Sequence, residues 1–267
     1  MNPSMREQPA FSIVIPAYNE EARLEATVRA YLGYFRTRGE PVELLVVDDG
    51  SLDGTTHLVE RLSIEFEQLR LIRLAQNQGK GYAVRSGVVN AHGRLILFAD
   101  ADGATPIQEI ERLEAAIAKG TDIAIGSRAL ASEQVEVRTQ IHRRIIGRGF
   151  HAMVRLCGVR GIADTQCGFK LFRGPVAHFL FSRMRISGFS FDVEVLLMAR
   201  LFGFVITEVP VNWVHQPGSR VNLMTDSARM AWDLLCIRLH HLRGEYRTPR
   251  LATWALSEAK HPAGGHL

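Results

Sequence analysis

The sequence Phe11-Ser12-Ile13-Val14-Ile15-Pro16 is a short apolar run rich in β-branched residues, and a polar segment follows it. A second run of the same kind is Glu43-Leu44-Leu45-Val46-Val47-Asp48. Between the two, residues 20–38 alternate apolar and charged side chains at helical spacing. Together the three segments predict a β-α-β unit.

Strand-like and helix-like segments keep alternating up to about residue 126. Apolar runs predict further strands at residues 71–74, 94–99 and 122–126, and helical spacing predicts helices at about 54–68, 79–92 and 106–119. Five strands that alternate with helices predict a Rossmann-like α/β fold, with a mostly parallel central sheet and helices on both faces. Ligands of such folds bind beyond the carboxyl ends of the strands, so polar segments that follow strands are the candidate site.

Two carboxylates stand one residue apart where the fourth predicted strand stops, in Ala99-Asp100-Ala101-Asp102-Gly103. Gly103 and Pro106 break the strand there. Carboxylate oxygens are hard ligands that suit Mg²⁺ or Mn²⁺, which commonly bridge protein carboxylates to substrate phosphates. The pair therefore predicts a divalent-cation site, with a loop that only caps the next helix as the alternative.

Other polar segments follow predicted strands and would meet the carboxylate pair at one sheet edge. Asp49 would be free to accept a hydrogen bond from a ring N–H such as that of uracil, and Tyr18 could cover the ring face. Lys80 is flanked by glycines at a predicted helix start, where backbone N–H groups and an ammonium suit phosphate oxygens. The alternative is that these residues only shape turns. The sequence lacks P-loop spacing, and no Gly-x-Gly-x-x-Gly follows the first strand, which argues against those two nucleotide-binding classes.

Composition narrows the class of protein. The 267 residues are 46% hydrophobic and 22% charged, which is ordinary for a folded soluble protein. The longest apolar candidate for a membrane span, residues 189–211, is interrupted by charged residues, so no spanning helix is expected. Three cysteines without Cys-x-x-Cys spacing, and a start that lacks the apolar stretch of a signal peptide, predict a reducing cytoplasm.

Charge is distributed unevenly along the chain. Residues 1–137 contain 14 Lys and Arg against 20 Asp and Glu, a net charge of −6, whereas residues 138–250 contain 17 against 7, a net charge of +10. The second part is therefore expected to meet an anionic partner. Two basic amphipathic stretches, at 138–157 and 223–243, indicate peripheral binding to a membrane surface, with core-packing helices as the alternative. No nucleic-acid partner is predicted, because aromatic residues are not interleaved with the basic segment as a stacking platform requires.

Taken together, these segments resemble the inverting family-two glycosyltransferases of GT-A fold, and within them the dolichyl-phosphate β-glucosyltransferases. The resemblance runs from about Phe11 to Arg220. It rests on Val14-Ile15-Pro16-Ala17-Tyr18-Asn19-Glu20, Asp48-Asp49-Gly50-Ser51, Gly79-Lys80-Gly81-Tyr82-Ala83-Val84-Arg85, Ala99-Asp100-Ala101-Asp102-Gly103-Ala104-Thr105, Asp164-Thr165-Gln166-Cys167-Gly168-Phe169-Lys170 and Val211-Asn212-Trp213. It implies transfer of a hexose, glucose from UDP-glucose, with Mg²⁺ or Mn²⁺, to a polyprenyl phosphate of the dolichyl or undecaprenyl kind.

The resemblance also implies roles for individual residues. The implied nucleotide-sugar site comprises Pro16, Tyr18, Glu20, Val47, Asp49, Lys80, Asp100, Ala101 and Asp102, with Asp100 and Asp102 as metal ligands. Asp164 aligns with an aspartate near the sugar, and a set of basic positions would meet the donor diphosphate or the acceptor phosphate: Arg128, Arg148 and Arg220. The chain departs from the mannose synthases at Ala104, where those enzymes often have glutamine, which argues for a different donor sugar.

The acceptor decides the expected mechanism. A phosphate monoester is already anionic at neutral pH, so in-line attack on the anomeric carbon, with inversion, needs no strong general base. A soluble sugar, polysaccharide or protein hydroxyl is the alternative acceptor, and would need a base, for which Asp164, Asp192 and Glu194 are candidates. A nucleotidyltransferase and a nucleic-acid-binding module are more distant alternatives.

The expected organisation has four parts. Residues 1–10 form an N-terminal tail, 11–222 the catalytic domain, 223–256 a basic amphipathic helical region, and 257–267 a disordered tail.

Overall fold

The computed structural model describes residues 8–130, 137–138, 154, 158–159, 161–214, 216 and 223–246. Its centre is a seven-stranded sheet with the order β3-β2-β1-β4-β7-β5-β8. The strands are β1 (Phe11–Ala17), β2 (Val42–Asp48), β3 (Leu69–Arg73), β4 (Leu95–Ala99), β5 (Ile123–Ser127), β7 (Phe169–Arg173) and β8 (Ile206–Pro210). A separate pair of short strands is formed by β6 (Val137–Arg138) and β9 (Trp213–Val214).

The sheet is parallel except at β7, which runs antiparallel between β4 and β5. The mostly parallel sheet predicted from the sequence is therefore confirmed, and all five predicted strands are present. The antiparallel strand and β8 were not predicted, because the alternation of strands and helices fades after residue 130. Since β7 runs in reverse, its first residue pairs with the last residue of β4. The segment that precedes β7 thus lies at the carboxyl end of β4.

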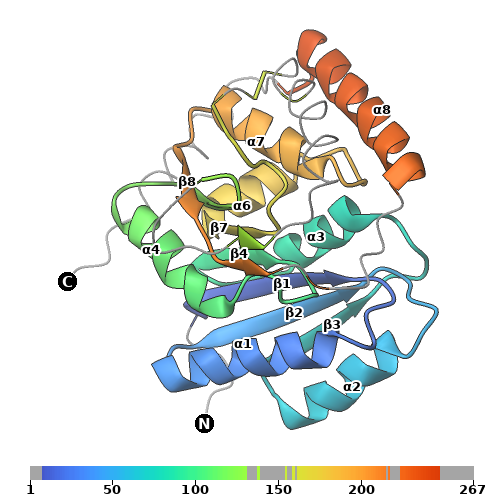
Figure 1. Cartoon of the computed structure of the whole chain (residues 1–267), viewed down its shortest axis with the longest axis vertical. Helices are drawn as coiled ribbons and strands as arrows, with labels where there is room; N and C mark the ends of the chain where they lie inside the picture. The colour runs from blue at the N-terminus through green and yellow to red at the C-terminus, as the bar shows by residue number, and fades with distance from the viewer. Residues whose placement is uncertain are drawn as a thin grey trace.

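Helices cover both faces of the sheet (Figure 1). One face is covered by α1 (Leu24–Arg38), α2 (Thr55–Glu65) and α4 (Ile110–Ala118), which follows the short 3₁₀ turn η1 (Ile107–Glu109). The other is covered by α3 (Lys80–Val89), α6 (Gly174–Phe181), α7 (Phe191–Leu201) and α8 (Leu223–Leu242). Successive residues of one strand face opposite sides, so Ile13 and Ile15 pack with the first group and Val14 packs with the second. Each face of the sheet therefore has its own apolar core.

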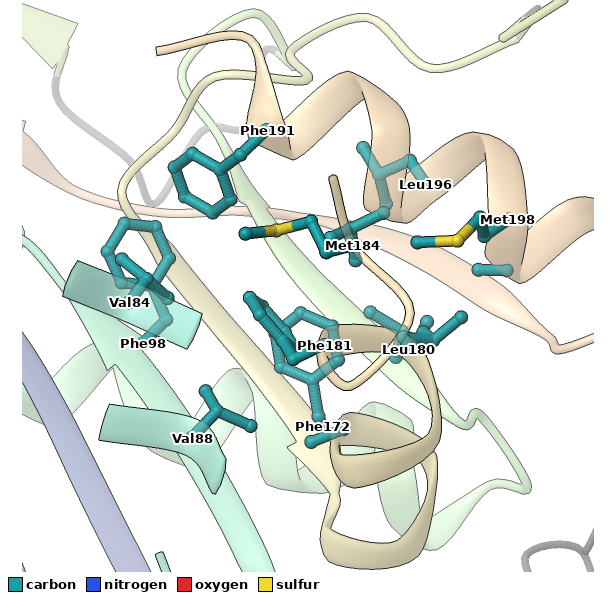
Figure 2. Packing of buried hydrophobic residues seen from close by; sticks show 14 of the residues in the cluster. Val84, Val88, Phe98, Phe172, Leu180, Phe181, Met184, Phe191, Leu196 and Met198 are labelled. Atoms are coloured by element: carbon teal, nitrogen blue, oxygen red, sulfur yellow. The ribbon is translucent and has the colours of Figure 1, made fainter. Parts of the chain in front are cut away.

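The core on the second face is rich in aromatic side chains, which Figure 2 shows in close-up. Phe98 on β4 contacts Phe191 at the start of α7 edge-on, with ring centroids 5.6 Å apart. Phe181 on α6 contacts Phe172 of β7 in the same manner at 5.5 Å. Such pairs contribute about 0.5–1.5 kcal/mol each beyond the burial of their area. The contact between Phe98 and Phe191 packs the first turn of α7 against β4, near the candidate site.

The second predicted amphipathic stretch forms α8, with Leu234 and Ile237 buried against the core. The stretch at 138–157 lies outside the described residues except for Arg138 and Val154, so its predicted helix is not described. Within the described ranges, no helix has the length and apolar character that crossing a membrane requires.

Candidate active site

The predicted convergence of polar segments at one sheet edge is present in the structure. The backbone N–H of Asp49 donates to the carbonyl of Ala17 (2.8 Å), which ties the end of β2 to the end of β1. The N–H of Asp100 donates to the carbonyl of Gly168 (3.0 Å), which ties the end of β4 to the segment before β7. Because β5 is parallel to β4, Arg128 follows it at the same edge. One edge therefore presents side chains from four strand ends.

Asp100 stands at the centre of this edge. The ammonium of Lys80, the first residue of α3, lies 2.6 Å from Asp100 Oδ1. Burial and the neighbouring charge of Asp100 raise the pKa of Asp102, so the two carboxylates of the pair repel one another. Burial alone would lower the pKa of Lys80, but the charges of Asp100 and Asp192 raise it overall, and Lys80 stays an ammonium. The site thus combines two carboxylates with the positive charge of the Lys80 ammonium.

The carboxylate pair fits a divalent cation that is shared with a substrate. A cage of three or more His, Cys, Asp or Glu side chains is absent from the described residues. Two carboxylates without a third protein ligand suit Mg²⁺ or Mn²⁺, because such ions are commonly held by one or two carboxylates and completed by substrate phosphates. The mutual repulsion of Asp100 and Asp102 is also relieved by a cation. We therefore assign Asp100 and Asp102 as the residues that would hold it.

The expectation that Asp49 is free for a ligand is corrected by its contacts. Its Oδ1 accepts the backbone N–H of Gln78 (2.8 Å) and its Oδ2 accepts that of Gly79 (2.9 Å). Burial raises the pKa of this carboxyl, since only 3% of the residue is exposed. Asp49 therefore holds the loop that leads into Lys80, and any contact with a nucleoside would use its remaining lone pairs. A sequence cannot show such a partner, because residues 49 and 78 are far apart along the chain.

The loop after β1 is clamped to the loop after β2. Asn19 adopts a positive φ of 55°, which asparagine tolerates better than most residues. Its N–H donates to Ser51 Oγ (3.0 Å) and its side-chain oxygen accepts the N–H of Leu52 (2.8 Å). Glu20, predicted at the nucleoside pocket, forms a two-point ion pair with Arg23 at 2.6 and 2.7 Å. Tyr18 lies on this clamped loop and is half-buried.

Three small or apolar members of the predicted nucleotide-sugar set are buried at the same edge. Pro16 pairs with Val47 across β1 and β2, and Val47 has no exposed surface. Ala101 is 5% exposed, and its carbonyl accepts a hydrogen bond from Thr27 Oγ1 (2.9 Å). Their buried side chains therefore pack inside the strand ends rather than facing a ligand.

Arg128 and Asp164 form a two-point ion pair. Arg128 Nε lies 2.7 Å from Asp164 Oδ2, its Nη2 lies 2.9 Å from Oδ1, and its backbone N–H also donates to Oδ2 (3.0 Å). Although burial alone would raise the pKa of Asp164, Arg128 holds it below the ordinary value. The Arg128 guanidinium lies 5.6 Å from the centroid of the Trp213 ring. Asp164 is therefore an anionic anchor for Arg128, which makes it a poor general base.

Two residues behind the carboxylate pair, Lys170 and Gly168, were not predicted as site residues. Lys170 is 1% exposed, and its ammonium lies 2.6 Å from both Asp192 Oδ1 and the carbonyl of Cys167. Gly168 is packed against Asp100, because a Cβ built there would lie 1.9 Å from Asp100 Oδ2. One signal was present in the sequence: a lysine inside the apolar strand Phe169–Arg173 needs a buried counter-charge. Two predicted residues, Arg148 and Arg220, lie outside the described residues.

Comparisons with known proteins show the family of the chain. Residues 12–181 match the family model described as Glycosyl transferase family 2. The chain is 38% identical to the Dolichyl-phosphate beta-glucosyltransferase of Saccharomyces cerevisiae over 259 residues, which covers 90% of this chain and 78% of that protein. It is also 38% identical to the Homo sapiens protein of the same name over 264 residues, with 92% and 80% covered.

Two solved structures have the same fold at lower sequence identity. Glucosyl-3-phosphoglycerate synthase from Mycobacterium tuberculosis, solved with UDP, gives a TM-score of 0.63 at 20% identity and covers 86% of this chain and 79% of that one. Mannosyl-3-phosphoglycerate synthase from Rubrobacter xylanophilus gives a TM-score of 0.60 at 17% identity, with 91% and 77% covered. At these identities the likeness shows the fold alone. The GT-A fold expected from the sequence is thereby confirmed.

Proposed function

Because the chain belongs to glycosyl transferase family 2, it is a glycosyltransferase, and we propose that it transfers glucose from UDP-glucose to the phosphate of a polyprenyl phosphate. The relatives named Dolichyl-phosphate beta-glucosyltransferase support both the sugar and the acceptor. One solved neighbour, the glucosyl-3-phosphoglycerate synthase of M. tuberculosis, was obtained with Mn²⁺ and UDP, which supports a nucleotide donor and a divalent cation.

The observation that carries the choice of acceptor is that the three general-base candidates named from the sequence, all within the described residues, are already engaged. Asp164 is bound at two points by Arg128. Asp192 pairs with the buried ammonium of Lys170 at 2.6 Å. Glu194 accepts hydrogen bonds from two backbone N–H groups, those of Arg185 and Ile186, and from the Tyr246 hydroxyl. A hydroxyl acceptor needs a free base, whereas a phosphate monoester does not, so these contacts favour a phosphate.

The proposed reaction is a single displacement. An oxygen of the lipid phosphate attacks the anomeric carbon of glucose, the bond from that carbon to the UDP oxygen breaks, and the configuration inverts. A divalent cation held by Asp100 and Asp102 would neutralise the charge on the departing diphosphate. In this scheme Lys80 donates hydrogen bonds to diphosphate oxygens, and Arg128 presents its charge beside the sugar, held by Asp164. In this reaction the residues of the chain position the substrates and neutralise charge, and none of them transfers a proton.

The nucleoside is assigned to the clamped loops at the first two strand ends. Tyr18 lies on the loop after β1, and Asp49 begins the loop after β2. Gly50 has a φ of 71°, and a Cβ there would lie 2.5 Å from the backbone of Gln76, so the turn accepts only glycine without rearrangement. These contacts hold the pocket loops in place before a ligand arrives.

The acceptor is tested by comparing lipids that differ only in the phosphate. UDP release is measured with UDP-glucose and either dolichyl phosphate or dolichol in the same detergent, with a panel of soluble sugars as a third arm. We expect release with dolichyl phosphate and background rates in the other two arms. Release with dolichol or a soluble sugar at a comparable rate would mean that a hydroxyl is the acceptor.

We also propose that α8 rests on the cytoplasmic surface of a membrane. Within residues 228–242 of this helix, the exposed large apolar side chains form one stripe at spacings of three and four residues: Trp232, Leu235, Leu239 and Leu242. Exposed Arg229 and Arg243 lie beside the stripe, and the acidic Asp233 faces inward, toward Ser190. An apolar stripe with basic flanks suits a surface of anionic lipids. The two described cysteines, Cys167 and Cys236, are free thiols, as a reducing compartment favours.

Flotation with liposomes that contain anionic lipid tests this surface. The chain is expected to float, and salt is expected to weaken the binding. A variant with Trp232→Gln and Leu242→Gln should stay in the dense fraction. Ile64→Gln, which removes an exposed apolar side chain from α2, is the matched control and should float as the unaltered chain does. Equal flotation of the double variant would mean that α8 does not bind the membrane.

A further inference from the structure

The ion pair between Lys80 and Asp100 has a consequence for how the cation binds. Lys80 Nζ lies 2.6 Å from Asp100 Oδ1, so the ammonium contacts one of the two carboxylates assigned to the cation. A metal ion and an ammonium compete for the same oxygen, because both bind it through positive charge. An ammonium on Asp100 Oδ1 offsets the charge of the carboxylate and repels a metal ion, so it weakens the binding of a cation there.

A second ammonium lies close by but is fixed. Lys170 Nζ is 5.5 Å from the centroid of the Phe98 ring, and Lys80 Nζ is 5.4 Å from the same centroid. Lys170 is bound by Asp192 and by the carbonyl of Cys167, and its side chain is 2% exposed. The side chain of Lys80 is 24% exposed and starts at the first residue of α3. Lys80 is therefore the ammonium that has room to move away from the carboxylates.

The ligands of the site are too few to hold a cation tightly without a substrate. Asp100 and Asp102 supply two carboxylates, and no third acidic, His or Cys side chain joins them among the described residues. With Lys80 on Asp100, a bare cation would meet one ammonium and the carboxylate of Asp102, whose Oδ1 also accepts the N–H of Ala104 (3.0 Å). A diphosphate favours the binding of the cation in two ways. Its oxygens complete the coordination of the cation, and they also accept hydrogen bonds from an ammonium.

We propose that Lys80 couples cation binding to nucleotide binding: it holds Asp100 in the free enzyme and moves to the diphosphate as the cation takes the carboxylate. This inference rests on the proposed UDP-sugar donor. It makes the cation and the nucleotide bind cooperatively, so each tightens the other by the same factor. Lys80 thereby keeps the negative site neutralised until the charged substrate arrives.

The test measures Mn²⁺ binding directly, from the electron paramagnetic resonance signal of free Mn²⁺, with and without UDP. For the unaltered chain we expect UDP to tighten Mn²⁺ binding at least tenfold. Lys80→Met removes the competing charge, so Mn²⁺ alone should bind roughly tenfold more tightly to the variant, and UDP should add less. Arg85→Met removes a positive charge one turn further along α3, at a side chain that contacts Ser182, and should leave both Mn²⁺ affinities unchanged.

Each result separates the coupling from the proposed donor. If Lys80→Met binds Mn²⁺ alone no more tightly than the unaltered chain does, while UDP still binds, the coupling is refuted and the donor stands. If the variant binds Mn²⁺ alone more tightly but UDP has no effect on either protein, Lys80 competes with the cation but the UDP donor is wrong, and the coupling falls with it. Lys80→Gln repeats the measurement with a second neutral side chain, and circular dichroism confirms that each variant is folded.

Discussion

Gly168 gives the sharpest test of the assigned cation site, because the carboxylate of Asp100 occupies the space that a side chain at 168 would need. A Cβ there would lie 1.9 Å from Asp100 Oδ2, 2.1 Å from Cγ and 2.5 Å from Oδ1. The backbone of Gly168 is outside the left-handed region, so alanine is not strained by its own conformation. Gly168→Ala therefore acts on Asp100 rather than on the local backbone.

The size of the effect follows from these distances. A Cβ approaches an oxygen no closer than 3.0 Å, so the contact of 1.9 Å must lengthen by about 1.1 Å. Metal-ligand distances tolerate about 0.2 Å, so a shift of this size removes Asp100 from the cation. Misplacement of a catalytic group by about 1 Å costs roughly 100-fold in rate, or about 2.7 kcal/mol of activation free energy. The Asp100 side chain is 36% exposed and can turn toward water, so the fold should persist.

The assay compares Gly168→Ala with a matched glycine. A Cβ at Gly126 would lie 3.1 Å from the carbonyl oxygen of Phe169 and 3.3 Å from Cys167 Sγ, close to the same segment but away from Asp100. We expect Gly168→Ala to lose at least tenfold in Mn²⁺ affinity in the presence of UDP and roughly 100-fold in kcat/KM, and Gly126→Ala to keep its Mn²⁺ affinity. If Gly168→Ala is folded and binds Mn²⁺ as tightly as the unaltered chain does, Asp100 is not a cation ligand in the position described here.

Three further predictions concern the charges and the thiol around the site. Asp192→Asn leaves the ammonium of Lys170, which is 1% exposed, without its counter-charge. The free energy of unfolding in urea should therefore fall by about 3–5 kcal/mol. A fall below about 1 kcal/mol would mean that Asp192 and Lys170 do not form a buried ion pair. Asp164→Asn removes the partner of Arg128, whose side chain is 31% exposed and can be hydrated instead. The free energy of unfolding should therefore fall by less, about 2 kcal/mol. A fall as large as that of Asp192→Asn would mean that water does not replace the lost contact of Arg128. Burial raises the pKa of the Cys167 thiol to about 12, so the thiol stays protonated at pH 8. Iodoacetamide should therefore leave Cys167 unmodified in the native chain, which mass spectrometry measures. Rapid modification would mean that the segment before β7 opens.

The sequence alone was enough to place the first five strands and the polar segments that follow them. Their apolar runs are short and separated by helices of clear periodicity, and the topology of a parallel sheet then brings Tyr18, Asp49 and Asp100 to one edge. The family resemblance drawn from those segments is confirmed by the relatives of this chain. Local pattern is sufficient here because each of these residues follows a strand directly.

The second half of the sheet could not be predicted in the same way. Strand β7 interrupts its apolar pattern with Lys170, whose charge is buried only because Asp192 arrives from α7. The antiparallel direction of β7 depends on the long connection before it, and a sequence pattern does not give the direction of a strand. Without that direction, the position of Gly168 beside Asp100 has no signal in the sequence.

The hydrogen-bond and ion-pair partners of the site residues could not be predicted from the sequence either. Asp49 was expected to be free, yet it accepts hydrogen bonds from Gln78 and Gly79. Lys80 was predicted at a phosphate, and the structure adds a contact with Asp100 that the sequence did not indicate. In both cases the residue type predicted the charge and the hydrogen-bonding capacity of the side chain, and only the structure gives the protein groups that this side chain contacts.

Following the labelled sugar shows whether the chain glucosylates a lipid phosphate. The purified chain is incubated with UDP-glucose labelled in the glucose, dolichyl phosphate and Mn²⁺ or Mg²⁺, and the label is counted after extraction into organic solvent, with EDTA as the control. We expect cation-dependent label in the organic phase, as a single β-linked glucosyl phosphate lipid. Label that stays in the aqueous phase while UDP is released, or transfer that EDTA does not reduce, would contradict the proposed function.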